Sequence, residues 1–180
     1  TTRAFDLRAY GHEIRHTLRR RDQEIFTLPD DRDPVAILVE QNARRLQDLV
    51  PVRMGRMLQS PFSYYRGTAG PMAYDLTASP TTNLRVVSCG DAHISNFGFF
   101  ASPERALLFD LNDFDEGAVA PWEWDLKRLV TSIVIAGQTS GRDDAVTAVE
   151  LAGTGDRGFC AGADVRALAR ILAEDGPWLR

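Results

Sequence analysis

The chain has 180 residues, of which 44% are hydrophobic and 26% are charged, a balance typical of a globular protein with one domain or one and a half. Its formal net charge of −4 provides no general attraction to nucleic acids or to anionic membrane surfaces, and no apolar run approaches the roughly 20 residues that span a bilayer. We therefore expect neither a nucleic-acid partner nor a membrane partner.

The two cysteines, Cys89 and Cys160, form no C-x-x-C pair, so the sequence gives no support for a zinc or redox motif. The N-terminal segment lacks the apolar core of a secretory signal. Free thiols in a reducing compartment are then the expected state, which predicts a cytoplasmic protein.

The N-terminal quarter of the chain is predicted to be helical. Residues 5–22 carry a basic amphipathic pattern, which favours a helix with one solvated face. Asp33 suits an N-cap and Pro34 the first position of a second helix. Apolar residues continue at near-helical spacing to Leu49, and Pro51 is expected to end that helix.

The next segments are short and of mixed type. We expect a short helix at residues 54–58, a strand at 62–65, one or two helical turns at 71–77 and a buried strand at 84–89. Two further strands, at 97–100 and 106–111, are expected to form a hairpin across the turn Ser102-Pro103-Glu104-Arg105.

A long helix is predicted to open at Pro121 and to end near Gly137 or Gly141. The pattern of residue types changes after Gly141. Residues 146–151 read as a strand, 153–162 are rich in glycine, and 164–173 read as a helix. The change predicts a domain boundary, with one domain at 1–142 and a second segment at 143–180.

The stretch CGDAHISNFG, residues 89–98, and the stretch LNDFDE, residues 111–116, carry the strongest chemical signal. Asp91 and Asn96 stand five residues apart in a loop between two predicted strands, and Asp113 follows the next strand. Phosphoryl transfer needs a carboxylate that takes the proton of the acceptor hydroxyl, and an Asn and a second carboxylate that hold Mg²⁺ against the phosphates. The kinase catalytic loop, H-R-D-x-x-x-x-N, has the same Asp-to-Asn spacing.

Each of these residues also has a plainer explanation. A Gly-Asp turn and an Asn after a strand commonly build Asx-turns, and Asp110, Asp113 and Asp115 could form a solvated acidic loop. The ordered set of Asp91, Asn96 and Asp113 favours the chemical interpretation over the plain one. Asp110 is the second candidate for the metal-binding carboxylate.

The same stretches resemble small-molecule kinases. GDAHISN is similar to the G-D-x-H-x-x-N loop of aminoglycoside phosphotransferases and choline kinases, and DFDEGAVAPWEWDL resembles their segment from the metal-binding Asp to a helix start. The resemblance implies that Asp91 is the catalytic base and that Asn96 and Asp113 bind the metal. It further implies that His93 orients the loop and that Asp125 supports it.

Longer motifs identify a family. RMGRMLQSPFSYYRG (53–67), MAYDL (72–76), CGDAHISNFG, FDLNDFDE and PWEWDLKRL (121–129) resemble the domain of unknown function 2252 family over roughly residues 3–140. The family has no settled biochemical function, so the resemblance implies a kinase-like catalytic half without a substrate. A kinase also needs a Gly-rich loop and a Lys that grip the phosphates, and nothing of that kind precedes Asp91.

The C-terminal segment resembles a different family. GTGDRG (153–158) matches G-x-G-x-x-G, but no helix opens at its third glycine, so we reject a dinucleotide site. AVELAGTGDRGFCAGADVRAL instead resembles the crotonase superfamily, which contains enoyl-CoA hydratases and 3-hydroxyisobutyryl-CoA hydrolases. The resemblance implies that the backbone N–H of Ala163 stabilises the oxyanion of a coenzyme A thioester. The second donor and the catalytic glutamates of that family are missing here.

The sequence therefore predicts an α+β fold: a partial kinase-like, aminoglycoside-phosphotransferase-like half followed by a strand-turn-helix crotonase fragment. The expected function is phosphoryl transfer from ATP, with Mg²⁺, to a small-molecule hydroxyl, and we expect this composite to be inactive by itself. The alternatives are acyl-CoA binding through Ala163 and a non-catalytic remnant. Because each part lacks packing partners, we expect marginal stability and self-association through exposed apolar surface.

Overall fold

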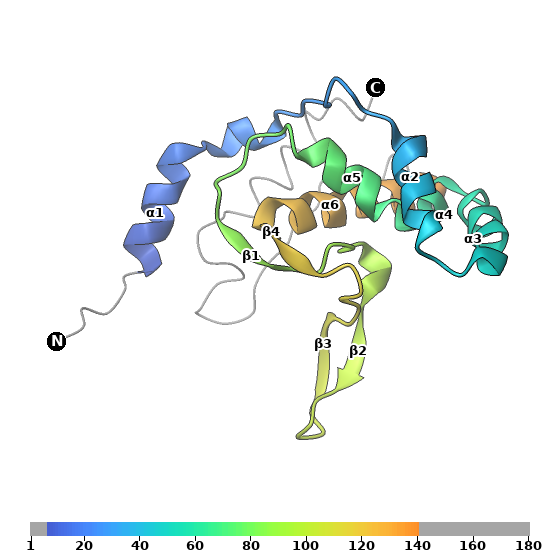
Figure 1. Cartoon of the computed structure of the whole chain (residues 1–180). Helices are drawn as coiled ribbons and strands as arrows, with labels where there is room; N and C mark the ends of the chain where they lie inside the picture. The colour runs from blue at the N-terminus through green and yellow to red at the C-terminus, as the bar shows by residue number, and fades with distance from the viewer. Residues whose placement is uncertain (1–6, 141–180) are drawn as a thin grey trace.

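The computed structural model describes residues 7–140, and Figure 1 shows how they are arranged. The α-helices are α1 (Leu7–Thr17), α2 (Pro34–Ala43), α3 (Val50–Met57), α4 (Pro61–Arg66), α5 (Ala69–Leu76) and α6 (Trp122–Thr139), with 3₁₀ turns η1 (Arg20–Glu24), η2 (Gln47–Leu49) and η3 (Ile94–Asn96). The strands are β1 (Arg85–Ser88), β2 (Phe97–Ala101), β3 (Leu107–Leu111) and β4 (Ala118–Pro121). This mixture of helices and small sheets confirms an α+β fold.

Several sequence predictions concern residues that lie outside the described part of the chain. The strand expected at 146–151, the helix expected at 164–173 and the crotonase-like segment that contains Ala163 all lie outside the described residues. Within residues 7–140 no helix combines the length and the apolarity that are needed to cross a membrane.

The start of α2 follows its local sequence. The Asp33 side chain accepts hydrogen bonds from the backbone N–H groups of Val35, at 3.0 Å, and Ala36, at 2.9 Å. Pro34 occupies the first turn, where its missing N–H costs nothing. The predicted N-cap is confirmed.

The predicted end of α2 was wrong. The helix stops at Ala43 rather than at Leu49, because the side-chain amide of Gln47 takes over the free carbonyls at this end and donates to Asn42 O at 2.9 Å. Pro51 does not end a helix but stands in the first turn of α3, a position that favours proline.

The strand predicted at 62–65 was also wrong, because these residues lie in α4. Ser60 caps the helix, and its hydroxyl accepts a hydrogen bond from Ser63 N at 3.0 Å. Pro61 opens the first turn, and Tyr65 is buried against the rest of the protein. The local capping signal outweighs the β-propensity of the aromatic residues.

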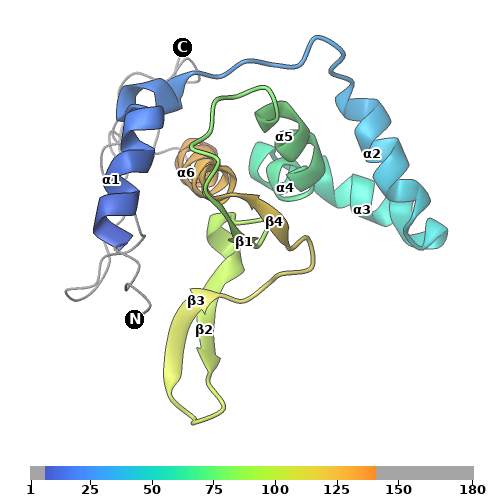
Figure 2. The ribbon, with the colours of Figure 1, turned by 60° about the vertical axis from the view of Figure 1, so that its left-hand side comes forward.

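The strands form two separate antiparallel pairs. β1 pairs with β4, and β2 pairs with β3. The β2–β3 hairpin confirms the sequence prediction, and it projects away from the helices in both views of the ribbon (Figures 1 and 2). The strand predicted at 84–89 forms as β1, but the expected burial was wrong for part of it, since Val87 is 78% exposed. Among the described residues β1 pairs with β4 alone.

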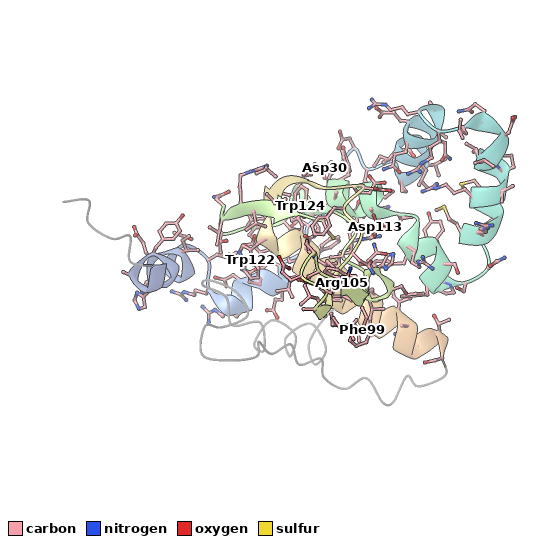
Figure 3. The ribbon with its side chains drawn as sticks, turned by 90° about the horizontal axis from the view of Figure 1, so that it is seen from below. Asp30, Phe99, Arg105, Asp113, Trp122 and Trp124 are labelled. Atoms are coloured by element: carbon pink, nitrogen blue, oxygen red, sulfur yellow. The ribbon has the colours of Figure 1, made fainter. Side chains whose placement is uncertain are left out.

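Large apolar side chains remain on the surface of the hairpin. Phe99 in β2 and Phe109 in β3 stack with ring centroids 5.0 Å apart, yet they are 71% and 61% exposed. Phe99 is labelled in Figure 3, which views the molecule from the side on which the hairpin projects. The predicted exposure of apolar surface is therefore present in the described residues.

Helix α6 lies at the centre of the fold and is the long helix that the sequence predicts. It contacts α4, α5, β1, β4 and η3. Its buried apolar residues are Leu126, Leu129 and Val130, and each fully buried side chain of this type contributes about 1.5–3 kcal/mol. Buried polar side chains lie on the same helix, at Glu123, Arg128 and Ser132. Helix α6 thus serves both as core and as a support for the site described next.

Candidate functional site

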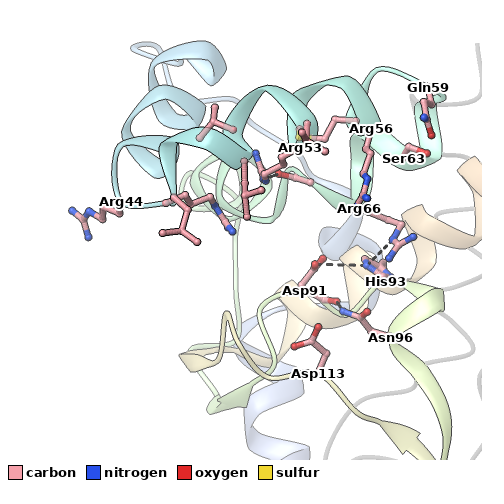
Figure 4. A pocket seen from close by; sticks show the side chains of 17 residues that line it. Arg44, Arg53, Arg56, Gln59, Ser63, Arg66, Asp91, His93, Asn96 and Asp113 are labelled. Carbon is pink, nitrogen blue, oxygen red and sulfur yellow. Dashed lines mark hydrogen bonds and ion pairs between the residues drawn. The ribbon is translucent and has the colours of Figure 1, made fainter.

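A cavity of about 970 Å³ lies between α2–α4 and the loop of residues 89–96. Asp91, His93, Asn96 and Asp113 all line it (Figure 4). The structure therefore brings together four of the residues that the sequence singled out. Asp125 does not line this cavity, and its contacts lie behind the loop.

The β2–β3 hairpin places Asp113 beside Asn96. Phe97 pairs with Leu111 at the base of the hairpin, and Asn112 N donates to Asn96 O at 3.1 Å. Asp113 follows directly and reaches the cavity, with its Oδ1 accepting a hydrogen bond from Asp115 N at 3.1 Å. The hairpin register therefore brings together two side chains that lie 17 residues apart in the sequence.

The Asn96 side chain is held from within the loop. Its Nδ2 donates to Asp91 O at 2.8 Å, and the residue is 7% exposed. Because the amide nitrogen is engaged inside the loop, the carbonyl oxygen Oδ1 is the end available to a cation. This is the orientation that a metal-binding Asn requires.

Asp91 is fixed by an ion pair with a residue that sequence reasoning missed. Arg128 from α6 donates to Asp91 Oδ1 through Nε, at 2.6 Å, and its Nη2 lies 2.5 Å from the same oxygen. Arg128 is 2% exposed, donates to Tyr65 O at 2.9 Å and stacks on the Tyr65 ring, with 4.5 Å between the guanidinium carbon and the ring centroid. The other oxygen, Oδ2, accepts no hydrogen bond from the described residues.

His93 is buried beside that free oxygen. Its Nε2 lies 3.6 Å from Asp91 Oδ2 and accepts a hydrogen bond from Arg66 Nε at 3.4 Å. Burial is the main cause that lowers the pKa of His93, and the positive charges of Arg66 and Arg128 act in the same direction, against Asp91. A neutral imidazole is the form that this environment favours.

Three polar residues of α6 hold the loop of residues 89–96 through hydrogen bonds and an ion pair. Asp125 Oδ2 accepts from Cys89 N at 2.8 Å, and its Oδ1 accepts from Gly90 N at 3.1 Å. Ser132 Oγ accepts from Ile94 N at 2.9 Å. Together with Arg128 they form the polar face of α6, because spacings of three and four residues put side chains on one side of a helix.

The Asp125 contacts are those that a loop-supporting residue needs. The position of Asp125 in the first turn of α6 also suits a carboxylate, since the helix N-terminus carries partial positive charge. Sequence reasoning missed Arg128 and Ser132. The available signal was their spacing from Asp125 in a helix whose apolar residues were already assigned.

Gly90 allows the loop to turn directly before Asp91. Its φ is +79°, a conformation that side chains disfavour. A Cβ at this position would stand 2.3 Å from the backbone oxygen of Glu116. The glycine is therefore required both by the turn and by the close approach of the β3–β4 segment.

Cys89 precedes this turn and is 1% exposed. Burial, with the negative charge of Asp125 as a second cause, raises the pKa of its thiol to about 12. Because only the thiolate reacts, we expect iodoacetamide at about pH 8 to alkylate Cys89 at least about 10³-fold more slowly in the folded chain than in urea. A Cys160→Ser variant isolates this thiol, and mass spectrometry measures the rate. Equal rates in both states would contradict the described burial.

The donor atoms of the cavity fit one kind of metal ion. Within residues 7–140 no group of three or more His, Cys, Asp or Glu side chains is arranged to hold a metal. Asn96 Oδ1 and the free oxygen of Asp113 provide two hard oxygen donors. Mg²⁺ is commonly held by one or two carboxylates together with water and substrate phosphates. The residues present therefore fit an Mg²⁺ ion that arrives with a phosphate ligand.

Arginines form the second group that the sequence analysis missed. Five of them line the same cavity: Arg44, Arg45, Arg53, Arg56 and Arg66. They come from the end of α2, from α3 and from α4. The motif RMGRM carried the signal, because its two arginines are three residues apart and share a helix face.

A comparison with protein families supports one of the sequence assignments. A family model described as "Uncharacterized protein conserved in bacteria (DUF2252)" matches residues 45–153, which is more than half of the chain. No curated protein and no solved structure matches the chain.

Proposed function

We propose that this chain, which belongs to the DUF2252 family, carries the acceptor-binding and metal-binding half of a phosphotransferase site. The reaction would pass the γ-phosphoryl group of Mg·ATP to the hydroxyl of a small molecule. The observation that supports this proposal is the presence of Asp91, Asn96 and Asp113 around one cavity, in the chain order that phosphoryl transfer uses elsewhere.

Asp91 is proposed as the base. Because Arg128 holds Oδ1, Oδ2 is the oxygen that can accept a hydrogen bond from the acceptor hydroxyl. The hydroxyl proton moves to Oδ2 while the acceptor oxygen bonds to the γ-phosphorus, and the bond from that phosphorus to the β–γ bridging oxygen breaks, releasing ADP. The buried His93 ring, whose Nε2 lies 3.6 Å from Oδ2, covers one side of the carboxylate.

Asn96 and Asp113 are proposed as the metal-binding pair. When bound, Mg²⁺ neutralises the charge of the β- and γ-phosphates and aligns them. This chain contributes the two oxygens and their spacing, which the backbone hydrogen bond between Asn112 and Asn96 fixes. The hydrogen bond from Asn96 to the Asp91 carbonyl couples the metal site to the base.

The test compares two carboxylates of the same hairpin. Asp113 lines the cavity, whereas Asp110 pairs opposite Gly98 within β3 and is not among the described residues that line it. We expect saturating Mg·ATP to raise the melting temperature of the parent chain and of Asp110→Ala by about 5 °C or more. Asp113→Ala should show no rise, because the metal that joins the nucleotide to the protein has lost its carboxylate.

The measurement is a thermal melt followed by circular dichroism, with Mg·ATP, with ATP and a chelator, and with Mg²⁺ alone. An equal response of the two variants would exclude Asp113 as the metal ligand. A parent chain that melts at the same temperature under all conditions would overturn nucleotide binding by this half of the site.

A further inference from the structure

We infer that the arginines lining the cavity, Arg44, Arg45, Arg53, Arg56 and Arg66, form a phosphate-binding wall, hereafter the arginine wall. The inference rests on the proposed function for the reaction that this wall serves, but its evidence is separate. It assigns to the cavity a ligand that carries phosphate groups and that is recognised by guanidinium groups rather than through Mg²⁺ alone.

Local structure explains why the arginines gather. Arg53 and Arg56 stand three residues apart on α3, so both project from one side of the helix. Arg66 ends α4, which packs against α3. Figure 4 shows Arg56 and Arg66 extending from the helices toward Asp91 and His93, whereas Arg44 points outward.

The charge of the cavity contrasts with that of the chain. The described lining contains five arginines and two aspartates, whereas the whole chain has a net charge of −4. Burial, reinforced by the positive charge of Arg45, lowers the pKa of Arg53. Like charges that repel one another in the free protein are stabilised when an anion binds between them.

Some of these arginines already have partners. Arg44 pairs with Glu40 and Arg45 with Glu116, each at 3.3 Å. Arg53 donates to Asn42 Oδ1 at 3.2 Å and to Gly67 O at 2.7 Å. Because these three guanidinium groups already have partners within the protein, they contribute positive charge to the cavity rather than free hydrogen-bond donors.

Arg56 and Arg66 are the two that can bind a ligand directly. Among residues 7–140 the guanidinium of Arg56 makes no hydrogen bond or ion pair, and that of Arg66 makes the single 3.4 Å contact with His93 Nε2. Both residues are exposed to the cavity. A free guanidinium fork matches two phosphate oxygens at once, so this pair is where the phosphate should lie.

The cavity is large enough for such a ligand. Its volume of about 970 Å³ is at the upper end of the range for small-molecule sites. The phosphates could come from two sources, the nucleotide itself or an acceptor that already carries a phosphate group. Both sources present the same chemistry to Arg56 and Arg66.

The test uses inorganic tripolyphosphate as the probe, titrated into the full chain by calorimetry with a chelator present, so that no Mg²⁺ takes part. We expect Arg56→Gln and Arg66→Gln each to weaken binding about 10-fold or more. Arg105→Asn removes one positive charge at the tip of the hairpin and should change the affinity less than about twofold. Arg66→Lys should restore part of the lost affinity, which shows that a loss in Arg66→Gln is not misfolding.

Three results would overturn the inference. The first is tripolyphosphate affinity that is the same in Arg56→Gln, Arg66→Gln and the parent chain. The second is an equal loss in Arg105→Asn, which would show attraction to the overall charge rather than a site. The third is absence of any binding by the parent chain.

A second titration, without the chelator and with Mg·ATP present, separates this inference from the proposed function and identifies the source of the phosphate. A parent chain that binds tripolyphosphate but does not respond to Mg·ATP supports the arginine wall and counts against the phosphotransferase. Competition between Mg·ATP and tripolyphosphate supports a wall that grips the nucleotide. Simultaneous binding of both supports a wall that grips a phosphorylated acceptor.

Discussion

Replacing Arg128 by methionine is expected to lower the free energy of unfolding by about 3–5 kcal/mol. The change removes the ion pair to Asp91, the hydrogen bond to Tyr65 O and the cation–π contact with the Tyr65 ring. It also leaves the partly buried Asp91 carboxylate, which is 20% exposed, without its cation. Domains are stable by only about 5–15 kcal/mol. This loss should therefore leave little folded protein, and the cooperative unfolding transition should weaken or disappear.

A double-mutant cycle tests the cause of this loss. In urea-induced unfolding, Asp91→Asn combined with Arg128→Met should be more stable than Arg128→Met alone, because the unpaired carboxylate is gone. Arg21→Met serves as the control, since the Arg21 side chain is 70% exposed, and it should change stability by less than about 0.5 kcal/mol. Additive effects in the cycle would show that Asp91 and Arg128 are not coupled.

Replacing Gly90 by alanine is expected to lower the free energy of unfolding by about 3 kcal/mol or more. A residue with a Cβ pays about 1–2 kcal/mol to adopt the left-handed conformation, and the new methyl group would stand 2.3 Å from the backbone oxygen of Glu116. The Glu116 oxygen belongs to the backbone and cannot move as a flexible side chain can, so the loop of residues 89–96 must shift. Asp91 would move with it.

Gly55→Ala provides the matched comparison. Gly55 lies inside α3, and a Cβ there meets nothing within 4 Å. The same chemical change should therefore raise stability by about 0.5–1 kcal/mol, because alanine is the better helix former. Thermal unfolding of both variants measures the contrast, and a Gly90→Ala chain as stable as the parent would show that the turn is not needed.

Local signals in the sequence predicted local structure well. Asp33 and Pro34 mark the start of α2, and the hairpin turn at residues 102–105 joins β2 and β3. In both cases the interactions that decide the structure lie within a few residues. The strand expected at 62–65 failed for a local reason as well, because Ser60 and Pro61 form a helix start, whereas the prediction used the aromatic residues alone.

Structure that depends on distant partners was not predicted. β4 was missed, because its partner residues in β1 lie 30 to 36 residues earlier and its four residues carry little pattern of their own. The exposure of Val87 has the same origin, since burial of a strand residue depends on which distant segments pack against its face of the sheet.

The candidate site also contains residues that could be predicted from local spacing and residues that depend on distant partners. Spacing along the chain was enough to select Asp91, Asn96 and Asp113, and the hairpin register brings the last two together. Neither Arg128 nor the arginine wall could be assigned, because a buried ion pair and a charged cavity arise only when α3, α4 and α6 pack. Helical spacing puts Arg53 with Arg56, and Asp125 with Arg128, on shared helix faces, but charged residues on a helix face are usually solvated, so the spacing alone does not assign them to a site.

The polar face of α6 also has a consequence for the order of events during synthesis. Asp125, Arg128 and Ser132 hold the loop across separations of 36, 37 and 38 residues. At about 5–20 residues per second, the loop leaves the ribosome some seconds before the helix that anchors it. Until α6 emerges and docks, Asp91 has no cation beside it and Gly90 N has no acceptor from α6. The loop is therefore synthesised first, and it acquires its geometry only after α6, the central helix that anchors it, has been made.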